Sequence, residues 1–94
     1  MKKIDLHIHT VATPSDRQFI FDLKRLKDYV RVRELDCIAI TNHNTFNLAQ
    51  FNEIRNALNI VVLPGIEIDL EGGQLLLIAD GSDLKDFALR CKKI

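Results

Sequence analysis

The chain has 94 residues, and its thirteen basic and thirteen acidic side chains cancel to a net charge of zero. This balance gives no general attraction to nucleic acid or to an anionic membrane, although a local site can still bind a phosphate group. Hydrophobic residues make up 47%, the proportion of an ordinary globular domain, and no apolar run is long enough to span a membrane. The N-terminal segment has Asp and His where a signal peptide needs an apolar core, so we expect a cytoplasmic protein.

Short apolar runs alternate along the chain with segments of helical period. Alternation of apolar and polar residues predicts a first strand over 3–9. Residues 10–21 contain Pro14 and are expected to form a loop. Asp22 is a plausible N-cap for a helix that runs to about Glu34.

The second strand is predicted over 37–41, where a continuous apolar run is typical of a parallel strand covered on both faces. Apolar residues at helical spacing predict a helix over 48–58, with Asn44 or Thr45 as its candidate cap. These two segments continue the alternation of strand and helix.

A third strand is predicted over 60–70, followed by a Glu-Gly-Gly turn and a fourth strand over 74–79. Ser82 or Asp83 can cap a last helix. The order βαβαββα predicts an α/β fold with a mainly parallel sheet, in a single domain.

Polar residues fall where the predicted strands end. His7 and His9 end the first strand, Asn42 and His43 end the second, and Glu67 lies late in the third. In α/β folds the carboxyl ends of the strands form the edge where sites are built. We therefore expect these side chains to meet at one edge of the sheet.

The pair His7 and His9 is separated by one residue, so on a strand both rings point to the same face. Two neighbouring imidazoles suit zinc, manganese or iron. Asp5 has the same parity and is expected to orient a ligand histidine from behind. The alternative is a pair of histidines hydrogen-bonded inside a polar barrel.

Three carboxylates receive different interpretations. Glu67 is flanked by apolar residues, and a buried carboxylate is costly unless it is paired or binds a metal, so we expect a ligand that can bridge two ions. Its alternative role is a salt bridge to a lysine or arginine. Asp69 is interpreted as a solvated residue, and Asp16, taken alone, as a turn or cap residue.

The segments DLHIHT at 5–10, AITNHNT at 39–45 and PGIEI at 64–68 resemble the motifs of the PHP family, named for polymerase and histidinol phosphatase members. The motifs occur in the same order and at similar intervals, and together they cover essentially the whole chain. The resemblance implies a distorted (β/α)7 TIM-like barrel, of which residues 1–94 would be the N-terminal portion.

The resemblance also implies a site and a reaction. His7 and His9 would bind a first divalent ion, Glu67 would bridge the first and second, and His43 and Asp16 would serve a third. With two or three ions of zinc, manganese or iron, such a site hydrolyses a phosphoester. The implied substrate is a phosphorylated small molecule, a nucleotide or a nucleic acid.

Three features depart from the family pattern. Many relatives have Asp where this chain has Asn42, and His where it has Gln74. We assign Asn42 and Gln74 to positions behind the ligands or near the substrate. The later family ligands fall in segments that this chain does not contain, since a full barrel needs roughly twice its length. We therefore expect a partial PHP domain that lacks the C-terminal half of the barrel.

Four interpretations remain open at this stage. The chain is a fragment or subunit whose missing barrel half completes a phosphoesterase, or two copies associate and pool their ligands. Bare sheet edges favour a homo-oligomer or a complementary partner in either case. A third interpretation is a catalytically degenerate module that acts as a metal-binding scaffold or regulatory domain. The fourth, an amidohydrolase-like enzyme, also begins with H-x-H but needs later residues that are not present.

Overall fold

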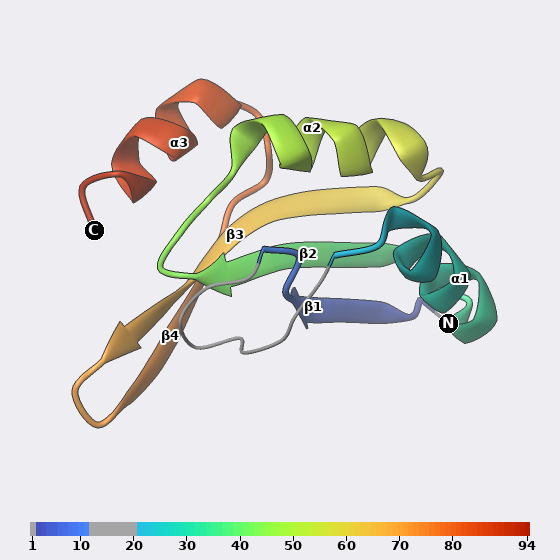
Figure 1. Cartoon of the computed structure of the whole chain (residues 1–94), viewed down its shortest axis with the longest axis horizontal. Helices are drawn as coiled ribbons and strands as arrows, with labels where there is room; N and C mark the ends of the chain where they lie inside the picture. Colours follow the sequence, from blue (N-terminus) through green and yellow to red (C-terminus); the bar gives the residue numbers. More distant parts are fainter. Residues whose placement is uncertain (1, 12–20) are drawn as a thin grey trace.

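The computed structural model describes residues 2–11 and 21–94. Within this part of the chain the elements follow the predicted order βαβαββα (Figure 1), which confirms an α/β fold. None of the helices in these residues is long and apolar enough to cross a bilayer. The elements are β1 (Ile4–Ile8), α1 (Leu23–Arg33), β2 (Cys37–His43), α2 (Leu48–Ala57), β3 (Val61–Leu70), β4 (Gly73–Ile78) and α3 (Leu84–Cys91).

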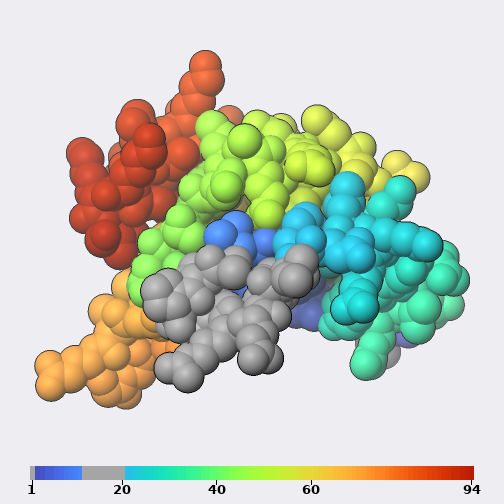
Figure 2. Space-filling model, viewed as in Figure 1, coloured from blue at the N-terminus to red at the C-terminus, as the bar shows by residue number. Residues whose placement is uncertain are grey.

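The four strands form one sheet in the order β1-β2-β3-β4. The β1–β2 and β2–β3 pairs are parallel, and β3–β4 is an antiparallel hairpin. The sheet is curled, so its mainly parallel strands and the accompanying helices have the shape of a partial barrel (Figure 1). The hairpin extends beyond the body of the molecule, as the orange segment in Figure 2 shows.

The apolar core lies between one face of the sheet and helices α1 and α2. Apolar side chains of α1 and α2 recur at helical spacing, so each helix presents an apolar stripe to the strands. Burial of such a side chain contributes about 1.5–3 kcal/mol, which makes this cluster the main source of stability. The buried cluster consists of Leu26, Val30, Ile38, Ile40, Phe51, Ile54 and Val62.

Side chains at the helix N-termini satisfy backbone N–H groups. Asp22 accepts hydrogen bonds from the first turn of α1, as predicted, and Asp83 does so for α3. The prediction for α2 was wrong: its N-cap is Asn47, whose side chain accepts from the Gln50 N–H. Asn44 is instead part of the turn after β2, where its φ of 53° is left-handed.

The pairing of β1 with β2 contains an irregularity that reverses the face of Asp5. Asp5 pairs with Ile38 and Ile8 with Ile40, so β1 uses one extra residue over this interval. This is the signature of a β-bulge. Asp5 therefore lies on the α1 side, where its Oδ2 accepts a 2.6 Å hydrogen bond from the Tyr29 hydroxyl. The expectation that Asp5 shares a face with the two histidines was wrong.

Candidate metal centre

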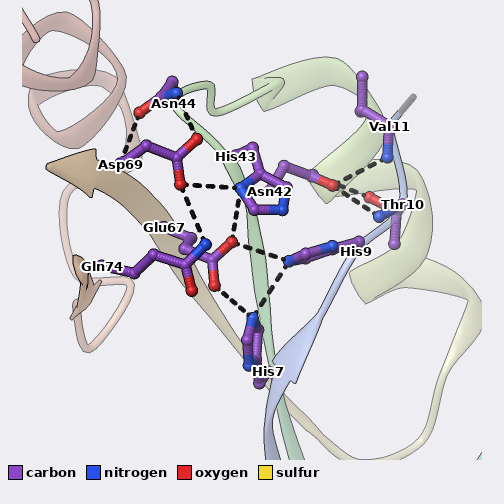
Figure 3. Close-up of polar contacts among 10 residues, drawn as sticks. All are labelled: His7, His9, Thr10, Val11, Asn42, His43, Asn44, Glu67, Asp69 and Gln74. Atoms are coloured by element: carbon purple, nitrogen blue, oxygen red, sulfur yellow. Dashed lines mark hydrogen bonds and ion pairs between the residues drawn. The ribbon is translucent and has the colours of Figure 1, made fainter. Parts of the chain in front are cut away.

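Side chains from β1, β2 and β3 converge at the carboxyl ends of these strands (Figure 3). The Oε1 atom of Glu67 lies 2.7 Å from His7 Nε2. Its Oε2 atom lies 2.6 Å from His43 Nδ1 and 3.4 Å from His9 Nε2. The structure thus brings together four of the residues that the sequence analysis placed at one edge.

Glu67 forms the floor of this cluster. Its side chain is 2% exposed, and the exposed fraction rises to 10% for His43, 22% for His9 and 49% for His7. The cluster therefore opens to solvent on the β1 side. Among the described residues, the ion-pair partners of Glu67 are histidines and include no lysine or arginine.

Close packing beneath the cluster depends on Gly65, two residues before Glu67 on the same strand face. A Cβ atom at Gly65 would lie 2.7 Å from the Thr41 methyl group and 2.9 Å from the Leu77 carbonyl oxygen. Because neither distance is tolerated, only glycine lets the strands keep this spacing. The glycine thereby helps to keep His43 and Glu67 directly opposite each other in the sheet.

The arrangement of these donor atoms suits a bound cation better than it suits hydrogen bonds between the side chains themselves. Glu67 Oε2 is completely enclosed but accepts no aligned hydrogen bond, although His43 Nδ1 is nearby. His7 Nε2 and His9 Nε2 face each other at 3.2 Å, where one proton at most can lie between them. Imidazole nitrogens and a carboxylate are the ligands that zinc, manganese and iron share. The residues present therefore fit a divalent ion.

Among the residues that the structure describes, two groups of donors in this cluster could hold an ion. One consists of His7, His9 and Glu67, and the other of His43, Glu67 and Asp69. In each group the donor atoms lie within 4.8 Å of one another. Glu67 belongs to both, as a bridging carboxylate would.

Asp69 was interpreted from the sequence as a solvated residue, but it contacts the site. Its Oδ1 lies 3.2 Å from His43 Nδ1 and accepts from Gln74 Nε2, and its Oδ2 accepts from Asn44 Nδ2. Desolvation acts to raise the pKa of this carboxyl, but the hydrogen bonds from Gln74, His43 and Asn44 outweigh it and lower the pKa below its ordinary value. The signal that could have identified Asp69 is its parity with Glu67 on the same strand.

Asn42 acts on the site from behind. It is buried, and its Oδ1 accepts hydrogen bonds from the backbone N–H groups of Thr10 and Val11 at 2.6 and 2.8 Å. Its Nδ2 donates to the Thr10 hydroxyl, a bond that an ionised Asp could not make. Asn42 thus fixes the backbone that directly follows His9.

The other predicted site residues have separate positions. Asp5 contacts the His7 backbone N–H through its Oδ1 at 3.1 Å, so it acts on the strand. Gln74 lies on β4 and reaches the cluster through Asp69. Asp16 lies outside the described residues.

The chain was also compared with models of protein families and with curated proteins. No family model and no curated protein matches it.

Proposed function

We propose that the chain is the N-terminal part of a PHP-type, metal-dependent phosphoesterase with a distorted (β/α)7 TIM-like barrel. The observation that carries this proposal is Glu67, a buried carboxylate approached by His7, His9 and His43 without an aligned hydrogen bond at Oε2. Its burial is costly unless a positive charge compensates it. Three sequence motifs of the PHP type supply these four residues.

The side chains of this cluster have distinct roles in the proposed reaction. Glu67, His7 and His9 would hold the ion, and Asn42 keeps the backbone that follows His9 in place. When bound, divalent zinc, manganese or iron would supply Lewis-acid stabilisation of charge on a phosphoryl group. The exposed His7 side of the cluster is where a phosphorylated small molecule, nucleotide or nucleic acid end would enter.

We further propose that another polypeptide segment completes the barrel. β4 is an edge strand, and its consecutive residues Leu75, Leu76, Leu77 and Ile78 are between 37% and 45% exposed. A continuous apolar strand is normally covered on both faces and paired along its edge. A complementary barrel half or a second copy of the chain would provide this cover.

A second candidate function is a catalytically degenerate module that binds metal as a scaffold or regulatory domain. Gln74 favours it, because many PHP relatives have a histidine at this position and an amide is a poor ligand. Metal binding without hydrolysis is the expected behaviour of such a module.

Metal titration of the purified chain tests the site. We expect tight binding of zinc or manganese, and we expect His7→Ala with His9→Ala to abolish it. Glu71→Gln changes an exposed carboxylate outside the cluster and serves as the control. Tight, stoichiometric metal in the double variant would refute the proposed site.

Hydrolysis of a phosphoester panel separates the two candidate functions. The chain is assayed with manganese or zinc, and Glu67→Ala provides the background. Metal-dependent turnover above that background supports the enzyme. Tight metal binding with no turnover, even after mixing with the complementary barrel half, supports the scaffold.

A further inference from the structure

Asp69 is held in one orientation by contacts from two other elements. Asn44 donates to its Oδ2 at 3.0 Å and also accepts from its backbone N–H at 2.9 Å. Gln74, from β4, donates to its Oδ1 at 3.2 Å. The carboxylate is therefore fixed even though it is partly exposed.

The turn that contains Asn44 ties the end of β2 to β3. Its left-handed φ of 53° is tolerated best by Gly, Asn and Asp, and its N–H donates to the Glu67 carbonyl oxygen at 2.7 Å. The same residue thus positions Glu67 through the backbone and Asp69 through the side chain. Both carboxylates are directed toward His43 (Figure 3).

We propose that His43 Nδ1, Glu67 Oε2 and Asp69 Oδ1 form a second cation site, with Asn44 and Gln74 as the residues that position Asp69. The inference rests on the proposed function, since it uses the same bridging Glu67. The buried Oε2 atom supports it independently, because it faces this group without an aligned hydrogen bond. Asp69 then provides the ligand that Gln74 cannot.

The two sites differ in chemistry. His7, His9 and Glu67 offer two nitrogens and one carboxylate, whereas His43, Glu67 and Asp69 offer one nitrogen and two carboxylates. Nitrogen-rich sets favour zinc, and oxygen-rich sets suit manganese or magnesium. The second site therefore accommodates a harder cation better than the first does, and we expect it to bind Mn²⁺ more weakly than the histidine pair binds zinc.

The probe is Mn²⁺, added to the full chain after one equivalent of Zn²⁺ and counted by electron paramagnetic resonance. We expect one Mn²⁺ per chain, and we expect Asp69→Asn to weaken its binding by about tenfold to a hundredfold. The matched control, Asp80→Asn, removes an exposed carboxylate outside the cluster and should leave Mn²⁺ binding unchanged. Calorimetric Zn²⁺ affinity should stay within about threefold in both variants, since the histidine pair is intact.

A second variant distinguishes the loss of a ligand from misfolding of the Asp69→Asn chain. His43→Gln removes the nitrogen ligand and should reproduce the loss of Mn²⁺ while retaining the tight Zn²⁺ site. Mn²⁺ affinity within twofold of wild type in Asp69→Asn, or no Mn²⁺ bound by the zinc-loaded chain, would overturn the second site alone. Failure of the wild-type chain to bind Zn²⁺ would overturn the proposed function as well.

Discussion

Glu67 and strand β4 are opposite exceptions to the rule that charged side chains are exposed and apolar side chains are buried. Glu67 is a carboxylate with 1% of its surface exposed, whereas β4 exposes a run of apolar side chains. The two are direct neighbours, because Glu67 pairs with Leu76 across the hairpin. Each is unfavourable in isolation, and each would be relieved by a different kind of ligand: a cation for Glu67, and an apolar strand or surface for β4.

The opposite edge of the sheet shows what an ordinary edge looks like. At the start of β1, the Lys3 side chain pairs with Glu34, and the Asp5 carboxylate accepts two hydrogen bonds. Charged side chains of this kind discourage further strands from adding to an edge. β4 contains no charged residue, so within the described sheet it is less protected than β1 against pairing with a foreign strand.

The largest effect is expected from Glu67→Gln, which removes the buried charge and keeps the shape. Metal-induced stabilisation, about 2.7 kcal/mol when the ion is present at a hundred times its dissociation constant, should disappear. Without metal, the variant should be more stable than wild type by about 1 kcal/mol, because it no longer buries a charged group whose Oε2 atom lacks an aligned hydrogen bond. Chemical denaturation with and without zinc measures both quantities.

Glu71→Gln is the matched control, because it neutralises an exposed glutamate in the neighbouring turn. It should change neither quantity. If metal-free Glu67→Gln were less stable than wild type by 1 kcal/mol or more, the histidines alone would already compensate the buried charge. Burial of Glu67 would then not be unfavourable without metal, and its contrast with β4 would no longer hold.

Local patterns were sufficient to predict much of this structure. The apolar run of β2, the Asp22 cap and the Glu-Gly-Gly turn each depend on neighbouring residues, and each was predicted correctly. The meeting of His7, His9, His43 and Glu67 followed from the position of each at a strand end.

Features that depend on register between distant segments were missed. One extra residue in β1 turns Asp5 toward α1, and nothing in the alternation of residues 3–9 reveals it. Asp69 reaches His43 only because β3 continues to Leu70 and Asn44 folds back onto it. Asn47 caps α2 because the helix begins at Leu48, whereas Asn44 belongs to the turn that ends β2.

The exposed apolar surface of β4 is tested by the double variant Leu75→Lys with Leu77→Lys, which places two charges on one face of this strand. We propose that the purified chain pairs β4 with β4 of a second copy, since identical uncharged edge strands can pair antiparallel about a two-fold axis. The variant should weaken self-association at least about tenfold, or roughly 1.4 kcal/mol, by sedimentation velocity.

The control for this pair is Val32→Lys with Leu89→Lys, which charges two exposed apolar positions on helices. It should leave self-association unchanged. A monodisperse wild-type monomer at high concentration would contradict pairing through β4. Equal weakening by both double variants would point to association through other surfaces.

The smallest effect is expected at Asp5, a carboxylate that already has hydrogen-bond donors at both oxygens. Tyr29→Phe removes one of them and should cost about 0.5–1 kcal/mol of unfolding free energy. The hydrogen bond to Asp5 raises the pKa of the Tyr29 hydroxyl above 10.0, so its contribution is present below pH 10 and is lost as the pH rises through the raised value. Zinc affinity should stay within about twofold, because Asp5 lies on the α1 side of the sheet. A tenfold loss of zinc affinity would mean that Asp5 does orient the histidines, and that the bulge transmits the change to the metal-binding face.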